Sequence, residues 1–326
     1  MKTDNFFGKI FDAFPPPDFL NIPFAGLSIS DTSIRSVQFG RKGGKLYIQK
    51  YTEKPIPEGV ITSGVINNQD EVVKLLTEVK NELKLGYVKI SLPEERAYLF
   101  TTKLPPVSQK ELRSAIESKM EENVPVSPLE LTFDYKIFYH KQRDHLDISV
   151  SALPISLIDQ YVDMASKSGL SLLSLEIESQ AIIRSLLPSN NKDTVLIIHF
   201  SPGKVSLYVS TYRVVRFTST IPTRGEQANN PGFLLQEIKK LYTYWNTLKE
   251  NVDKADRKIS QIIVCGEKFE DTMISYLSSH LDTPIVMGNV WTNVFDINSS
   301  LPEISFSDSL RFSASVGLAL PGDVLI

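Results

Sequence analysis

One pattern of strands and turns occurs twice in this chain, and it restricts the folds that the chain can adopt. Residues Ala25–Phe39 read as an apolar strand, a short polar turn and a second alternating strand, and Leu196–Val209 read in the same way. Another strand follows each unit and ends in a proline turn, at Ile56–Gly59 and at Ile221–Gly225. A long amphipathic helix comes next in both halves. The repetition predicts two related subdomains that face each other across a cleft.

The length and composition fit two globular domains or one large, divided domain. The chain has 326 residues, of which 42% are hydrophobic and 22% charged, and its net charge is −3. These values are ordinary for a globular protein and give no electrostatic basis for binding nucleic acid. The longest apolar runs, such as Val195–Phe200, have the length of a strand, whereas a membrane helix needs about 20 apolar residues. We expect no signal peptide or transmembrane segment, so work at a membrane would require peripheral association.

Cysteine and histidine residues indicate neither a disulfide nor a metal site. The single cysteine, Cys265, rules out an internal disulfide and suits a reducing compartment. Of the four histidines, only His140 and His145 are close in sequence, and the residues around them lack the spacing of zinc ligands. We expect two surface histidines on a strand–turn–strand and no bound metal.

The N-terminal arm, residues 1–22, has one apolar face at helical spacing. Phe7, Ile10, Phe11 and Phe14 fall on that face, and three prolines follow and would end a helix. One interpretation is an amphipathic arm that docks on lipid or a partner, and the other is an arm packed on its own domain. Lysines and aspartates balance one another in the arm, so the cationic face of a membrane binder is missing, which favours the second interpretation.

Alternating strands and helices after the arm indicate an α/β fold with an insertion. The capping box Ser108–Glu111 opens a charged helix, which two strands, a second helix and a further strand follow. Small residues around Gly317 give the closing helix room for close backbone packing. The predicted parts are a first subdomain at 23–107, an inserted α+β lobe at 108–173, a return and linker at 174–192, a second subdomain at 193–304, and a closing helix and tail at 305–326.

Several short segments occur in an order that is typical of one family. They are the first turn Gly26–Arg35, Pro57–Ile61 with Gly64–Ile66, Glu122–Glu130 and Phe133–Tyr135 in the insertion, Leu175–Glu178, and Ser315–Leu320 in the closing helix. Together they resemble the PilM family, the actin-like cytoplasmic proteins of bacterial type IV pilus assembly, and more distantly the cell-division protein FtsA. The resemblance covers Ala25 to Leu320. It implies an actin-like, ribonuclease H-like duplicated α/β fold with an inserted subdomain of the SHS2 type.

Both turns depart from the family pattern at the positions that serve nucleotide chemistry. Where the first turn of the family has an acidic residue and a glycine, this chain has Ser28 and Ser30. Where the second turn has Asp-hydrophobic-Gly, the chain has His199, Phe200 and Ser201. In the actin-like mechanism the aspartates hold the magnesium shell, and the glycines let backbone N–H groups approach phosphate. Serine and histidine do not replace carboxylates as ligands of a hard cation.

The resemblance still places a nucleotide cleft between the two halves. Its candidate residues are Ser28, Ser30, Asp31, Ser201, Gly203, Lys204, Gly225 and Gly266. The ligand implied by resemblance is ATP, with binding weakened or lost, and we assign no catalytic residue and no metal ligand. The segment Pro202–Lys204 fits a phosphate-binding turn and fits an ordinary hairpin turn equally well. Asp31 would reach the cleft only if the register of the turn shifts by one residue.

Two functions follow from the resemblance, and the missing aspartates favour the first. It is a scaffold at the cytoplasmic face of the inner membrane that assembles a type IV pilus or a related secretion or competence machine. The alternative is an active ATPase with an altered site. A division protein similar to FtsA is disfavoured because the tail Pro321–Ile326 is too short for that family's membrane helix.

The resemblance also implies partners. In the PilM family, a cleft between the first and inserted subdomains takes the N-terminal tail of the inner-membrane protein PilN. By resemblance, the groove here would lie among the Ser108–Met120 helix, the Leu131–Tyr139 strand and the first subdomain. We expect a PilN-like tail and other pilus assembly proteins as partners. Charge changes at Glu117, Glu121 or Glu122 in the inserted helix would then alter association.

Overall fold

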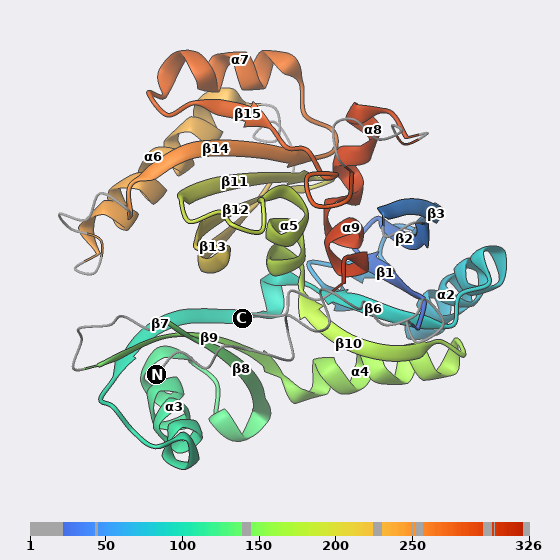
Figure 1. The fold of residues 1–326 in the computed structure, drawn as a ribbon, viewed down its shortest axis with the longest axis horizontal. Coiled ribbons are helices and arrows are strands. Elements are labelled where there is room, and N and C mark those ends of the chain that lie inside the picture. The colour runs from blue at the N-terminus through green and yellow to red at the C-terminus, as the bar shows by residue number, and fades with distance from the viewer. Residues whose placement is uncertain are drawn as a thin grey trace.

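Two five-stranded sheets with the same topology form the main body of the molecule (Figure 1). The computed structural model describes residues 22–42, 45–138, 145–223, 230–248, 251, 257–295, 302 and 304–321. The first sheet has the order β10 (Ser171–Ile177), β6 (Tyr87–Leu92), β1 (Phe24–Ile29), β2 (Ser33–Lys42), β3 (Lys45–Pro55). The second has the order β13 (Val214–Pro222), β12 (Lys204–Thr211), β11 (Thr194–Ser201), β14 (Ile259–Gly266), β15 (Ile285–Met287).

The two sheets are built in the same way, which confirms the duplicated unit predicted from the repeated pattern. In the first sheet β1, β2 and β3 form an antiparallel meander, and β6 and β10 continue the sheet parallel to β1. In the second sheet β11, β12 and β13 form the meander, and β14 and β15 run parallel to β11. Parallel strands need covered faces, and helices supply that cover on both sides of each sheet.

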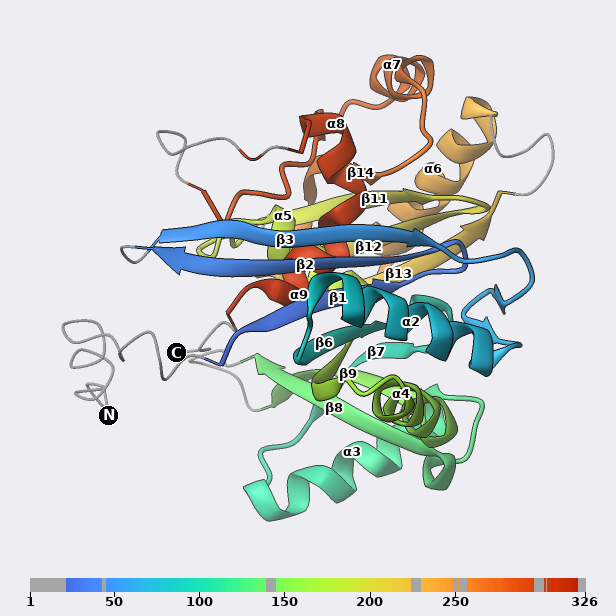
Figure 2. The same cartoon turned by 90° about the vertical axis from the view of Figure 1, so that its right-hand side faces the viewer.

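Helices form one inner layer and two outer layers (Figures 1 and 2). The inner pair, α5 (Glu178–Leu186) and α9 (Ser313–Ala319), packs between the sheets in one apolar core. On the outer faces lie α2 (Gln69–Leu83) with α4 (Ile155–Lys167) over the first sheet, and α6 (Pro231–Thr247) with α7 (Asp271–His280) over the second. The shorter elements are β4 (Ile61–Thr62), β5 (Val65–Ile66), α8 (Phe306–Ser309) and the 3₁₀ turns Glu94–Arg96, Pro128–Glu130 and Leu310–Phe312.

The inserted lobe is a separate three-stranded sheet backed by one helix. Its strand order is β7 (Tyr98–Leu104), β9 (Leu146–Pro154), β8 (Leu131–Phe138), all antiparallel, and α3 (Gln109–Asn123) covers one face. Ser108 and Glu111 form the expected capping box at the start of α3. The lobe contacts the second half of the molecule, since Ser149 Oγ donates a hydrogen bond to the Val215 carbonyl (3.3 Å).

The predicted bounds of the insertion, residues 108–173, are wrong at both ends. Strand β7 precedes residue 108 but pairs only with β9 among the described strands, so it belongs to the lobe. Helix α4 and strand β10 belong to the first half: Tyr161 and Met164 are buried in its core, and β10 pairs with β6. Helix α4 covers the apolar face of the first sheet, and β10 extends that sheet by one strand. Both contacts join residues that are distant in sequence, so local patterns did not indicate them.

Candidate functional site

The first hairpin turn is closed by its own serine side chain. Ser30 Oγ accepts hydrogen bonds from the backbone N–H of Thr32 (3.4 Å) and of Ser33 (3.1 Å). Ser28 is buried within β1 and is the partner of Arg35 across the hairpin. The two serines that replace the expected carboxylate and glycine therefore serve the turn and the sheet. A serine side chain commonly closes a turn in this way.

Asp31 links this turn to the neighbouring β4–β5 turn. Its carboxylate accepts hydrogen bonds from the backbone N–H of Ser63 (2.6 Å) and of Gly64 (3.0 Å). Ser63 and Gly64 have positive φ angles of 49° and 72°; this conformation is strained for Ser63, and the carboxylate helps to hold it. Asp31 lies near enough to Lys204 for their charges to interact, and both of its carboxylate oxygens accept these hydrogen bonds.

The second hairpin turn carries Lys204 into the cleft between the halves. Ser201 pairs with Lys204 at the end of β11 and β12, and Gly203 occupies the left-handed region (φ 81°) that the turn requires. Lys204 Nζ forms an ion pair with Glu95, which lies in the 3₁₀ turn after β6 in the first half. Lys204 and Glu95 are both largely buried, with side chains 12% and 13% exposed.

The cleft around Lys204 contains two further buried acids. Burial alone would lower the pKa of Lys204, but the carboxylates of Glu178 and Glu95 outweigh it and raise its pKa. Burial raises the pKa of Glu178, although Lys204 and Arg35 act in the opposite sense. Burial also raises the pKa of Glu94 to about 7, and this side chain accepts a hydrogen bond from the backbone N–H of Ser179 (3.1 Å). Acidic groups therefore surround the turn where phosphate was expected.

A second ion pair crosses the cleft, and here the first half supplies the cation and the second half the anion. Arg35 of β2 donates two hydrogen bonds to one oxygen of Glu53, at 2.9 and 2.7 Å, within the first half. Its guanidinium also bonds Glu267, which follows β14 in the second half. Arg311 donates to the other oxygen of Glu53 at 3.2 Å. This network thus joins both sheets to the segment that leads into the closing helix.

His199, which stands where the second turn of the family has its aspartate, is a neutral core residue. Burial, with the charges of Lys204 and Arg35, lowers its pKa to about 3. Its ring lies 6.3 Å from the ring of Tyr208, centroid to centroid. A neutral imidazole does not supply the negative charge that a magnesium shell requires.

Gly266 is needed for strand packing. Its φ is 98°, and a Cβ atom at this position would overlap the backbone of Phe200 on the neighbouring strand. The close approach of β14 to β11 explains the glycine without a nucleotide. Gly225 lies outside the described residues. Of the predicted residues, the structure brings Asp31 and Lys204 to one region of the cleft, and both already have partners within the protein.

Sequence reasoning missed the acids that fill the cleft. Glu95 and Glu178 follow the ends of parallel strands β6 and β10, and Glu267 follows β14. The carboxyl ends of parallel strands are the usual edge for functional side chains in open α/β sheets. Charged residues directly after predicted strands were therefore the signal that could have identified them.

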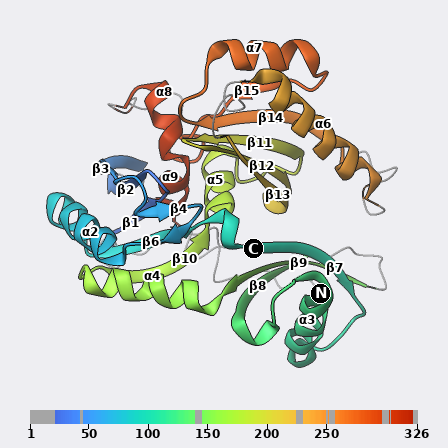
Figure 3. The same ribbon diagram turned by 180° about the vertical axis from the view of Figure 1, so that it is seen from behind.

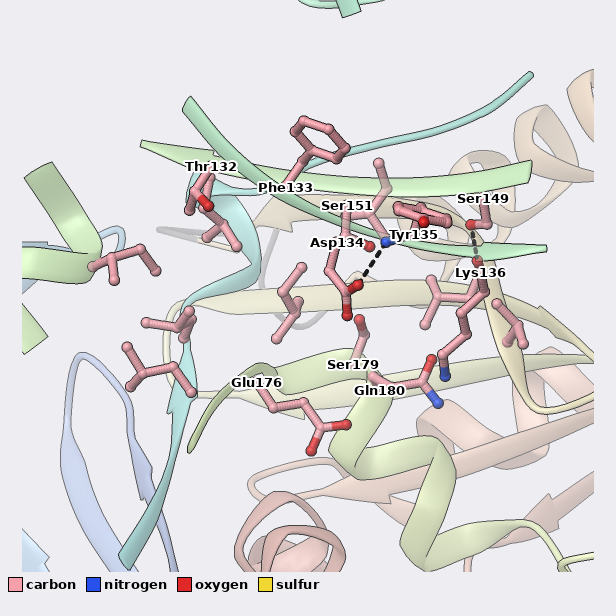
Figure 4. A pocket seen from close by; sticks show the side chains of 18 residues that line it. Thr132, Phe133, Asp134, Tyr135, Lys136, Ser149, Ser151, Glu176, Ser179 and Gln180 are labelled. Carbon is pink, nitrogen blue, oxygen red and sulfur yellow. Dashed lines mark hydrogen bonds between the residues drawn. The ribbon is translucent and has the colours of Figure 1, made fainter. Parts of the chain in front are cut away.

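A groove lies between the inserted lobe and α5 (Figure 4). The cavity has a volume of about 280 Å³ and is lined mainly by the sheet face opposite α3, by the start of α5 and by β13. Thr132, Asp134 and Lys136 of β8 face across it toward Ser179 and Gln180. Helix α3 does not line this cavity, because it covers the other face of the sheet (Figure 3).

Strand β8 forms one edge of the lobe's sheet, and β7 forms the other. Among the described strands it pairs only with β9. The backbone N–H of Tyr135 donates to the carboxylate of its own neighbour, Asp134, at 2.8 Å. Unpaired strand edges can accept another strand, and charged side chains commonly protect them. The groove therefore combines an available strand edge with polar and apolar side chains.

These features define a class of protein: an actin-like molecule of two related halves, with an inserted lobe and an interdomain cleft crossed by ion pairs. A family model described as type IV pilus assembly protein PilM matches residues 26–259, more than half of the chain. The chain belongs to the PilM family of type IV pilus assembly proteins. The resemblance inferred from the sequence is thereby confirmed.

Solved structures support the actin-like fold. The chain matches a PilM-PilN type IV pilus biogenesis complex with a TM-score of 0.75 and 14% identity, over 93% of this chain and 98% of that chain. It matches the ethanolamine utilization protein EutJ from Carboxydothermus hydrogenoformans with a TM-score of 0.50 and 12% identity, over 95% and 91%. A further match, to the cytoplasmic domain of the inner-membrane type II secretion component EpsL of Vibrio cholerae, has a TM-score of 0.48 and 9% identity, over 79% and 94%.

In the part of the chain that the structure describes, no helix has both the length and the hydrophobicity to cross a bilayer.

Proposed function

We propose that this protein is a scaffold of type IV pilus assembly that holds the cytoplasmic tail of a PilN-like inner-membrane protein. The observation that carries the proposal is the groove between β8 and α5. Its length follows consecutive residues Thr132–Lys136 of an edge strand, which suits an extended peptide. A peptide that adds to a strand edge gains main-chain hydrogen bonds, and side-chain pockets supply selectivity.

Three observations support this partner. The similar solved structure is a complex of PilM with PilN, and the chain covers 98% of the protein matched there. The groove contains apolar side chains, such as Leu153 and Ile158, beside hydroxyl and amide groups. Apolar pockets with a few placed polar groups are the usual form of a specific binding site. A tail bound in this groove would hold the protein at the cytoplasmic face of the inner membrane, where other pilus assembly proteins would join it.

We further propose that the nucleotide cleft is degenerate. Lys204 and Asp31, the charged members of the predicted site, are bonded within the protein to Glu95 and to the β4–β5 turn. Glu95 compensates the charge of Lys204, so the turn has little positive charge left for a polyanion. In this proposal the protein acts through its shape and its binding surfaces.

A peptide-binding experiment tests the proposal. Ser151 is half-buried on the groove face of β9, and Ser118 is exposed on the outer face of α3. We expect a fluorescent peptide with the N-terminal sequence of the cognate PilN-like protein to bind the wild type. Ser151→Trp fills the groove and should weaken binding at least about tenfold, a loss of roughly 1.4 kcal/mol. Ser118→Trp makes the same substitution on the same lobe and should bind as the wild type does.

Fluorescence anisotropy measures the affinities, and thermal unfolding checks that both variants fold. The proposal fails if the wild type does not bind the peptide. It also fails if folded Ser151→Trp binds it as tightly as Ser118→Trp does.

A further inference from the structure

Three parts of the molecule build the peptide groove. Strand β8 of the inserted lobe forms one wall, and the other walls come from the end of β10 with the start of α5 and from Val214 and Val215 of β13 (Figure 4). Strand β10 belongs to the first sheet and β13 to the second. The width of the groove therefore depends on how the lobe and the second half lie against the first half.

The lobe is joined to the first half beside this groove. The turn Glu94–Arg96 connects β6 of the first sheet to β7 of the lobe, and Leu92 and Leu99 on either side of the turn line the groove. Glu94 accepts a hydrogen bond from the backbone N–H of Ser179 at 3.1 Å, and Ser179 also lines the groove. A displacement of this turn would thus move groove-lining residues before α5, after β6 and in the lobe together.

Lys204 holds this turn from the second half. Its ion pair with Glu95 is largely buried, with side chains 12% and 13% exposed. Lys204 is the first residue of β12, and the last residue of that strand, Thr211, pairs with Val214 at the start of β13. One hairpin therefore meets the turn Glu94–Arg96 at one end and lines the groove at the other.

Two other contacts leave this role to the Lys204 pair. At the groove end of the hairpin, Ser149 Oγ of the lobe donates a hydrogen bond to the Val215 carbonyl at 3.3 Å, which is a single neutral contact. The second ion pair across the cleft, Arg35 with Glu267, joins β2 to the residue after β14, and neither of its members lines the groove. Of the two ion pairs, the Lys204 pair is thus the one that acts on the groove side.

We propose that Lys204 and Glu95 are positioning residues for the peptide groove: their ion pair holds β13 and the lobe at the separation that admits an extended peptide. The peptide in this statement rests on the proposed function, whereas the separation of the walls does not. A role in stability alone predicts something different. Loss of the pair would then lower the free energy of unfolding and leave the distance between the lobe and the second half unchanged.

Distances between spin labels, measured by pulsed electron paramagnetic resonance, test the separation directly. Ser118 on α3 and Ser278 on α7 are exposed on opposite sides of the molecule, and the native Cys265 is fully buried (Figure 1). With both serines changed to labelled cysteines, we expect one narrow distance distribution. Lys204→Met and Glu95→Gln should each broaden it or shift its maximum by more than about 2 Å, the scale of a domain rearrangement.

Lys54→Met is the matched control, because it removes an ion pair, with Glu78, that joins two elements of the first half and does not line the groove. It should keep the wild-type distance distribution. Thermal unfolding checks that each variant folds. A folded Lys204→Met protein with the wild-type distribution would overturn the proposal.

Peptide affinity is the second measurement. Lys204→Met should weaken binding of the fluorescent PilN-like peptide at least about fivefold, the lower range of coupling between two sites. Addition of Glu95→Gln should weaken it no further, because both changes remove the same pair. If the distances change and the affinity does not, the pair does not position the peptide and the proposal is overturned. Absence of binding by the wild type would refute the proposed function instead, and the distance distributions would still decide whether the pair sets the groove.

Discussion

At the residue scale, the cleft is a set of buried charges that balance one another across the two halves. Lys204 brings a cation from the second half to Glu95, and Arg35 brings one from the first half to Glu267. A buried ion pair adds little net stability, but removal of one partner leaves an uncompensated charge that costs several kcal/mol. The pairs therefore fix how the halves face each other more than they add stability.

Glu94 makes the stability of the folded protein depend on pH, and its pKa sets the direction of this dependence. Its pKa in the folded protein, about 7, is above the ordinary value of 4.5 because of burial. The folded state thus binds this proton more tightly than the unfolded chain does. The resulting stability is present below pH 4.5 and is lost as the pH rises through 7.

We predict that Glu94→Gln stabilises the protein at pH 8 by on the order of 2–3 kcal/mol and leaves it unchanged near pH 4.5. A glutamine keeps an acceptor for the Ser179 N–H without burying a charge. Urea denaturation at several pH values measures the free energy of unfolding. Glu58→Gln, at an exposed position, should not alter the pH profile. Equal profiles for wild type and Glu94→Gln would contradict the assignment.

At the element scale, the sequence predicted what local patterns determine. The repeated hairpins and the capping box of Ser108 and Glu111 depend on neighbours a few residues away. Alternation of apolar residues then indicated the strands of both sheets. These signals were sufficient for the duplicated α/β fold.

Features that depend on distant partners were not predictable in this way. Helix α4 exposes Val162 to 45% and buries Met164, because it packs on the core of the first half. Strand β10 looked like the end of the insertion, although its partner is β6. In the cleft, the sequence did not show that the close approach of β11 leaves no room for a side chain at Gly266.

The crossing of α5 and α9 gives a prediction at this scale. A Cβ atom on Gly317 would overlap the Ala181 carbonyl, which is backbone and has no room to move aside. Gly317→Ala should therefore separate the two inner helices and destabilise the protein by about 2–4 kcal/mol, as overpacking of a core does. Gly86→Ala meets no atom within 4 Å and should be close to neutral. Thermal unfolding compares the two, and equal midpoints would contradict the packing argument.

At the scale of the whole molecule, core packing and side-chain contacts join the two halves. The inner core of α5 and α9 touches both sheets. The inserted lobe contacts β13 at two points. Ser149 of the lobe bonds the Val215 carbonyl, and the Cζ atom of Arg216 in β13 lies 3.4 Å from the ring centroid of Phe138 in the lobe. Actin-like clefts close on phosphate and magnesium, whereas here side chains of the protein cross the cleft. An anion that entered would have to separate Lys204 from Glu95 and approach further acids.

We predict that ATP with magnesium is neither hydrolysed nor bound well enough to stabilise the fold. Ser28 and His199 stand where the family has the carboxylates of its magnesium shell, and the carboxylate of Asp31 is bonded to the β4–β5 turn. A ligand that binds only the folded state stabilises it by RT ln(1 + [ligand]/Kd), so millimolar ATP that does not bind should leave the thermal midpoint unchanged. Phosphate release should equal that of buffer. Release above that level in the wild type, lost in Lys204→Met, would show instead that the cleft opens and that the second hairpin still contacts phosphate.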